Sequence, residues 1–64
     1  MNRPTITPHQ MEVLDAYRRL GDWRAVADEL DVPSSNVRRN AGKAYERLGV
    51  NGAIQAFRVL GWLL

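Results

Sequence analysis

Apolar residues in this chain recur three and four positions apart in four short segments, and a glycine or a proline stands at each break. This spacing places the apolar side chains on one face of an α-helix. Gly21, Pro33 and Gly49 mark the breaks, and Gly61 closes the last segment. Glycine adopts readily the left-handed backbone that ends many helices. The pattern therefore predicts an all-α fold of four short helices joined by short connections.

A residue that can cap a helix precedes each segment. Its side-chain oxygen accepts a hydrogen bond from a backbone N–H of the first helical turn. The expected capping residues are Thr7, Asp22, either Ser34 or Ser35, and Asn51. Gln10 stands three residues after Thr7 and completes the reciprocal pair known as a capping box. The first helix is therefore expected over residues 8–20, and the second begins directly after Asp22.

The apolar positions of the four segments form the expected core. In chain order they are Met11, Val13, Leu14, Tyr17, Leu20, Trp23, Val26, Ala27, Leu30, Val37, Ala41, either Ala44 or Tyr45, Leu48, Val50, Ala53, Ile54, Phe57 and Leu60. Residues 1–6 are expected to form an N-terminal arm. Because the sequence has 64 residues, residues 7–64 are expected to form a single domain.

Composition argues against several classes of protein. The chain has no cysteine and one histidine, so we expect no disulfide, no metal site and no cofactor. No paired carboxylates and no nucleophile with its base can be assembled, so we do not expect an enzyme. No apolar run approaches the roughly 20 residues that span a bilayer, and no secretion signal is recognisable. The sequence therefore predicts a cytoplasmic protein.

Charge is distributed unevenly although the net charge is only +2. Arg38, Arg39, Lys43 and Arg47 lie within ten residues against the single acid Glu46. The acids of the preceding segment are Asp22, Asp28, Glu29 and Asp31. The outer face of the third helix is expected to consist of Ser35, Arg38, Arg39, Gly42, Lys43 and Glu46. The third helix should therefore present a basic face to solvent.

The third helix has the chemistry of a DNA-reading element. A short turn at Val32-Pro33 joins it to the apolar second helix, which is the order of a central helix-turn-helix. Arg38 and Arg39 can each form a forked pair with guanine O6 and N7 or with phosphate. At the helix start, the phosphate-donating residues are expected to be Ser34, Ser35 and Asn36. The alternative is that the paired arginines form only a solvated face.

Three further residues allow two interpretations each. Glycine inside a helix costs about 1 kcal/mol relative to alanine, so Gly42 reflects either crowding by the first helix or close approach to DNA. Lys43 either contacts DNA or, like Arg47, offsets Glu46 or complements the C-terminus of the helix. Trp23 either covers the edge of the core or lies beside the DNA backbone.

Several short motifs carry a family resemblance. They are Thr7-Pro8, Glu12-Val13-Leu14, Val26-Ala27-Asp28-Glu29-Leu30, the stretch from Val32 to Arg38, Leu48-Gly49-Val50, and Gln55-Ala56. In their order and spacing, from about residue 6 to residue 64, the chain resembles the LuxR/GerE-type DNA-binding domain. The resemblance implies a small bacterial or phage transcriptional regulator whose third helix enters the major groove of double-stranded DNA. It also implies a phosphate contact by Arg24, for which a surface salt bridge to Asp28 is the alternative.

The chain departs from the family pattern at identifiable positions. His9-Gln10 replaces an Arg-Glu pair, and Gly21 stands one position later than the glycine of the family pattern. Pro33 occupies the position of a capping Ser or Thr. These departures describe a divergent member, either stand-alone or one domain of a larger regulator. A more general sigma-factor-like or phage-type helix-turn-helix is the alternative.

The C-terminal segment is more apolar than a small monomer normally leaves exposed. The residues concerned are Val59, Trp62, Leu63 and Leu64. The resemblance implies that the fourth helix pairs two copies into a homodimer on DNA, through Gln55, Arg58, Val59 and Trp62. Alternatively, Trp62 and Leu63 fold back onto the first helix. A third possibility is a protein-interaction module, in which residues 57–64 dock onto another regulator or onto RNA polymerase.

Overall fold

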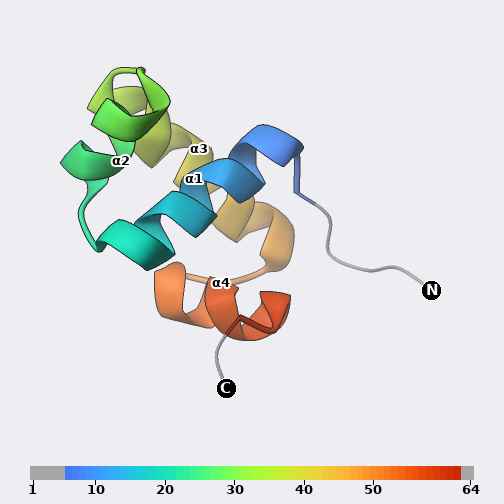
Figure 1. Cartoon of the computed structure of the whole chain (residues 1–64). Helices are drawn as coiled ribbons and strands as arrows, with labels where there is room; N and C mark the ends of the chain where they lie inside the picture. Colours follow the sequence, from blue (N-terminus) through green and yellow to red (C-terminus); the bar gives the residue numbers. More distant parts are fainter. Residues whose placement is uncertain (1–5, 63–64) are drawn as a thin grey trace.

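The structure is a computed structural model that describes residues 6–62, and this part of the chain forms four helices and no strand (Figure 1). The helices are α1 (Pro8–Leu20), α2 (Trp23–Leu30), α3 (Ser34–Leu48) and α4 (Ala53–Leu60). Helices α1, α2 and α3 pack against one another, whereas α4 lies mainly against α3. The all-α prediction and the predicted bounds of the first helix are confirmed.

The N-terminus of α1 is capped as the sequence predicts. The backbone N–H of Gln10 donates to Thr7 Oγ1 over 3.1 Å, and the N–H of Thr7 donates to Gln10 Oε1 over 2.9 Å. Gln10 is itself buried, so the capping box also satisfies a polar side chain in the interior. Asp22 caps α2 through a bond of 3.2 Å from the N–H of Ala25 to its carboxylate.

The predicted caps of α3 and α4 are wrong. Helix α3 begins at Ser34 with Pro33 as its N-cap, and no side chain caps it. The fixed φ of proline, here −62° with ψ 147°, already supplies the extended backbone that an N-cap needs. Gly52 rather than Asn51 precedes α4, again without a side-chain cap. Both helices therefore begin without a capping side chain. The backbone geometry of such a helix start is only weakly indicated by the type of residue.

Helices α2, α3 and α4 end in the same way. Each is followed by a residue with a left-handed backbone, with φ of 58°, 70° and 76° at Asp31, Gly49 and Gly61. The next residue donates its N–H to the carbonyl five positions earlier and packs against the core; these residues are Val32, Val50 and Trp62. This is the Schellman arrangement with its apolar contact. It turns the chain so that an apolar side chain folds back inward after each helix.

The core lies where the helices meet. Its buried apolar residues are Val13, Leu14, Ala16, Val26, Ala27, Val37, Ala41, Ala44, Leu48, Ala56 and Phe57. Of the two residues left open on α3, Ala44 is fully buried and Tyr45 only partly.

Three residues predicted to face the core are exposed instead. Met11 is 38%, Leu20 39% and Ile54 56% exposed. Met11 lies beside the buried arc of α1, and Leu20 is the last residue of that helix. Ile54 is exposed because α4 is covered mainly on the side that faces α3, where Ala56 and Phe57 are buried.

The predicted N-terminal arm lies outside the described residues except for Ile6, which packs against the core. Leu63 and Leu64 also lie outside them. In the described part of the chain, no helix combines the length and the apolar character needed to cross a membrane.

Candidate nucleic-acid interface

The exposed side of α3 is opposite its buried apolar stripe. Ser35, Arg39, Gly42 and Glu46 are exposed and follow one another at intervals of four, three and four residues. Side chains at these intervals lie one above another along a helix. We call this row the central line of α3. Arg38 and Lys43 are exposed on opposite flanks of it, so the predicted outer face is confirmed as a solvent-facing surface.

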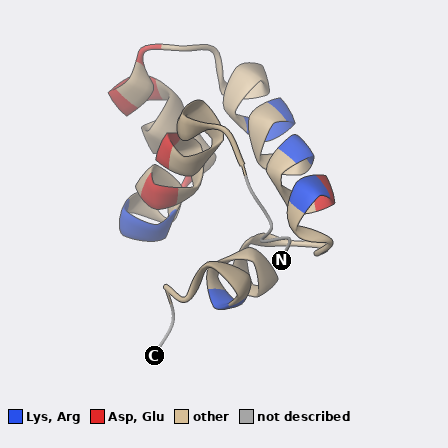
Figure 2. Cartoon of the chain, turned by 90° about the vertical axis from the view of Figure 1, so that its right-hand side faces the viewer, with Lys and Arg blue, Asp and Glu red and all other residues tan. Residues whose placement is uncertain are grey.

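The basic residues of this surface are not neutralised by ion pairs within residues 6–62. Among residues 6–62, ion pairs occur only on α1 and between α1 and α2. Arg38, Arg39, Lys43 and Arg47 take part in none of them. Figure 2 shows Lys and Arg along one side of α3. Glu46 is the one acid of this helix, and the other acids lie on or next to α1 and α2. The surface therefore carries positive charge that is available to an anionic partner.

The alternative roles proposed for Lys43 and Arg24 as ion-pairing residues are not seen. Lys43 makes no ion pair with Glu46, and Arg24 makes none with Asp28, among the residues that the structure describes. All four side chains are exposed.

The first turn of α3 presents polar groups to solvent. Ser34 and Ser35 are exposed, and neither hydroxyl caps the helix. Asn36 is half-buried, and its Oδ1 accepts a hydrogen bond of 3.0 Å from the side-chain amide of Asn40. The same amide donates to the Asn36 carbonyl oxygen over 2.9 Å. Asn40 thus fixes the side chain of Asn36, a role missed in the sequence although the four-residue spacing of two asparagines could have indicated it.

Gly42 is not required by the packing of the protein. A Cβ added there would have no heavy atom within 4 Å, so the interpretation that the first helix crowds Gly42 is wrong. Its φ also lies outside the left-handed region that favours glycine. Neither internal contacts nor backbone conformation therefore explains a glycine in the middle of this face.

Trp23 packs at the edge of the core. Its ring stacks on that of Tyr17 with centroids 3.9 Å apart and planes 12° from parallel. Stacked aromatic rings stabilise beyond the apolar area they bury. This contact joins the start of α2 to α1 and agrees with the core-edge interpretation of Trp23.

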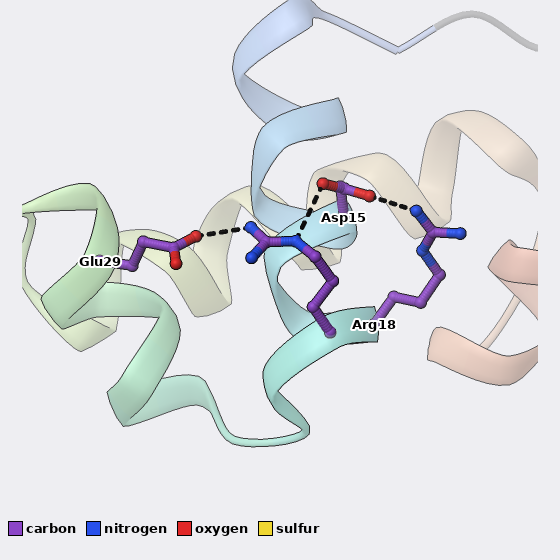
Figure 3. A network of polar contacts seen from close by, with 4 residues as sticks. Asp15, Arg18 and Glu29 are labelled. Atoms are coloured by element: carbon purple, nitrogen blue, oxygen red, sulfur yellow. Dashed lines mark hydrogen bonds and ion pairs between the residues drawn. The ribbon is translucent and has the colours of Figure 1, made fainter.

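A polar network that involves no residue of α3 joins α1 to α2 (Figure 3). Asp15 pairs with Arg18 and with Arg19, and Arg19 Nη2 lies 2.6 Å from Glu29 Oε2. The hydrogen bond from Arg18 is the main reason that the pKa of Asp15 is lowered from its usual value. The hydrogen bond to Glu29 is the main reason that the pKa of Arg19 is raised. These arginines are occupied by structural contacts, in contrast to those of α3.

Part of the predicted pairing surface on α4 is exposed. Gln55, Arg58 and Val59 face solvent, together with Ile54. Trp62 instead is half-buried, with its ring centroid 5.7 Å from that of Phe57 and 4.7 Å from Arg18 Cζ of α1. Trp62 therefore folds back toward α1, as the alternative interpretation predicts.

Among residues 6–62, no three side chains of His, Asp or Glu come together as a metal ion would require. Comparison with known proteins finds no matching family model, no matching curated protein and no matching solved structure. The functional assignment therefore depends on the residues and geometry described above.

Proposed function

We propose that this protein binds double-stranded DNA in a sequence-specific manner and acts as a small transcriptional regulator rather than as an enzyme. The observation that carries this proposal is the face of α3, where Arg38, Arg39, Lys43 and Arg47 make no ion pair within residues 6–62. The acids that could neutralise them lie mostly on α1 and α2. In this proposal α2 and α3 act as a helix-turn-helix, and α3 enters the major groove.

The position of each residue on α3 supports a distinct role. Arg39 lies on the central line, from which a side chain reaches base edges most directly, so we assign it to guanine O6 and N7. Arg38 and Lys43 lie on the flanks, where the phosphates of the groove walls run. Ser34, Ser35 and Asn36 donate to phosphate at the helix start, and Arg24 provides a further phosphate contact from α2.

The exposed side of α4 supports a second part of the proposal. Ile54 and Val59 are 56% and 46% exposed, and Gln55 and Arg58 lie between them. We propose that a second copy of the chain covers this surface when the protein is on DNA. A two-fold dimer would place two copies of α3 in successive turns of the major groove, about 34 Å apart.

The same exposed apolar residues favour one competing function, which is docking onto another regulator or onto RNA polymerase without DNA binding. Such docking does not require the basic face of α3. Light scattering of the free protein, combined with titration of a random DNA duplex, separates the two functions. Docking alone predicts no duplex binding at any salt concentration.

Selection of bound sites from a random duplex pool tests the DNA proposal. We expect a reproducible and partly palindromic preferred sequence. Arg39→Ala should reduce the preference for this sequence over random duplex, whereas Lys43→Ala should weaken both equally. Each variant removes one positive charge from the same face, so each is the control for the other. Equal losses on selected and random duplexes for both variants would contradict the assigned roles.

A further inference from the structure

The central line of α3 contains one position without a side chain. Gly42 stands between Arg39 and Glu46, whose exposed side chains lie one turn to either side. A Cβ at Gly42 would meet open space, and its backbone does not need the conformational freedom of glycine. The residue weakens α3 without an internal reason, because glycine inside a helix is less stable than alanine.

The absence of this side chain changes the shape of the surface. Arg39 and Glu46 hold an approaching surface away from the helix axis, whereas at Gly42 the backbone itself is uncovered. A convex partner surface can therefore come closer to α3 at Gly42 than at its neighbours on the line. The internal structure leaves this position free for such a partner, and the basic surroundings favour an anionic one.

We propose that Gly42 is the point of closest approach between α3 and the floor of the major groove, and that Arg39 and Glu46 read base edges on either side of it. This inference depends on the DNA-binding function proposed above. Glu46 stands seven positions after Arg39, which corresponds to about 10.5 Å along a helix. That length covers about three base-pair steps of about 3.4 Å.

The chemistry of the two side chains specifies their partners. The guanidinium of Arg39 donates to guanine O6 and N7. The carboxylate of Glu46 only accepts hydrogen bonds and is repelled by phosphate, so its matching group in the major groove is the N4 amino group of cytosine. Glu46 is exposed and makes no ion pair within the described residues, although Lys43 stands three residues before it. Each half-site should therefore contain a guanine and a cytosine about three base pairs apart.

Substitution of Gly42 tests the point of closest approach, because folding and binding should change in opposite directions. Gly42→Ala should raise the melting temperature of the full chain by about 4 to 8 °C, since alanine favours the helix and its Cβ has room. Binding to the selected duplex should weaken by about tenfold or more, and further in Gly42→Leu, as the side chain holds the helix off the groove. Unchanged affinity of both variants for the selected duplex would overturn the inference.

Substitution of Glu46 tests the reading role. Glu46→Gln removes the charge but keeps the shape, and glutamine pairs with adenine N6 and N7 rather than with cytosine. Site selection with this variant should therefore replace cytosine by adenine at one position of each half-site and leave the guanine of Arg39 unchanged. An identical preferred sequence, bound more tightly because a negative charge is lost, would show that Glu46 faces phosphate and reads no base.

The outcomes separate the two levels of the proposal. If the unaltered protein binds no duplex, the proposed function fails and this inference fails with it. If it selects a sequence but the Gly42 and Glu46 variants select and bind that sequence as before, only the inference fails.

Discussion

Asp31 ends α2 in a left-handed backbone conformation, with φ of 58°, although it is not a glycine. Aspartate tolerates this region better than most residues, but every side chain with a Cβ is strained there. The conformation is needed because the N–H of Val32 bonds to the carbonyl of Ala27 over 3.1 Å and directs Val32 inward. Asp31 therefore positions the connection from which α3 begins.

Substitution at Asp31 separates backbone conformation from charge. Asp31→Val should destabilise the fold by about 1 to 2 kcal/mol, because a β-branched side chain is disfavoured at positive φ. Asp31→Gly removes the same carboxylate and should not destabilise it. Thermal unfolding followed by circular dichroism measures both. Equal destabilisation by the two variants would mean that the carboxylate, and not the backbone, matters here.

Single residues also show how far the sequence allows prediction. Thr7, Gln10 and Asp22 are predictable caps because their side chains form the capping bonds. The N-caps at Pro33 and Gly52 are not predictable in this way, because neither residue forms a side-chain capping bond. The inward turn of Trp62 is one of three interpretations that the sequence leaves open, yet the sequence contains a signal for it. Trp62 follows a helix-ending glycine as Val50 does, and both pack against the core.

At the scale of elements, α4 is held differently from the other helices. It packs mainly on α3, and its end is joined to α1 by the contact between Trp62 and Arg18. Spacing alone placed Ile54 in the core, because periodicity indicates which residues share a face but not how widely that face is covered. The exposure of Ile54 and Val59 depends on the tertiary position of α4, which no local pattern specifies.

Two substitutions in the C-terminal segment compare the half-buried Trp62 with the exposed Val59 in their effect on stability. Trp62→Ala should destabilise the monomer by about 2 kcal/mol, since Trp62 is half-buried and a fully buried tryptophan contributes more. Val59→Ala should change stability by less than about 0.5 kcal/mol because Val59 is exposed. Denaturant titration at low protein concentration measures both effects. The opposite ranking would contradict the position of Trp62 against Phe57 and Arg18.

The ion pairs of Asp15 with Arg18 and Arg19 on α1 should respond to acid. The pKa of Asp15 is lowered in the folded protein, mainly by the hydrogen bond from Arg18, so folding favours its charged form. The contribution of Asp15 to the free energy of unfolding is fully present above its pKa in the unfolded chain, about 3.8. This contribution is lost as the pH falls below that value. Asp15→Asn should lower the melting temperature at pH 7 by no more than a few degrees, because the pairs are exposed. The curves of the variant and the unaltered protein should converge near pH 2 to 3, and a constant difference down to that pH would argue against the linkage.

At the scale of the whole molecule, most of the acids lie on or next to α1 and α2, whereas α3 carries four basic residues and one acid (Figure 2). Asp15 of α1 and Glu29 of α2 pair with Arg18 and Arg19, whereas the basic residues of α3 make no ion pair within residues 6–62. The sequence predicts this basic face because the charges are close together along one helix. It could not show that the arginines of α1 are occupied, since the pair of Arg19 with Glu29 joins two helices.

The oligomeric state is a property of the same scale. If α4 pairs two copies on DNA, Val59→Ala and Ile54→Ala should weaken binding to a site with two half-sites much more than binding to a single half-site. Titration of both duplexes, with light scattering of each complex, measures the difference. Equal effects on the two duplexes would indicate that each copy binds alone.

The central claim, that the uncovered basic face of α3 contacts DNA phosphates, is tested most directly by the salt dependence of binding to random duplex. The logarithm of the affinity should fall linearly and steeply with the logarithm of the salt concentration. In Lys43→Ala the slope should become shallower by about one, because one phosphate contact is lost. Duplex binding that does not change with salt, or a slope that Lys43→Ala leaves unaltered, would contradict the claim.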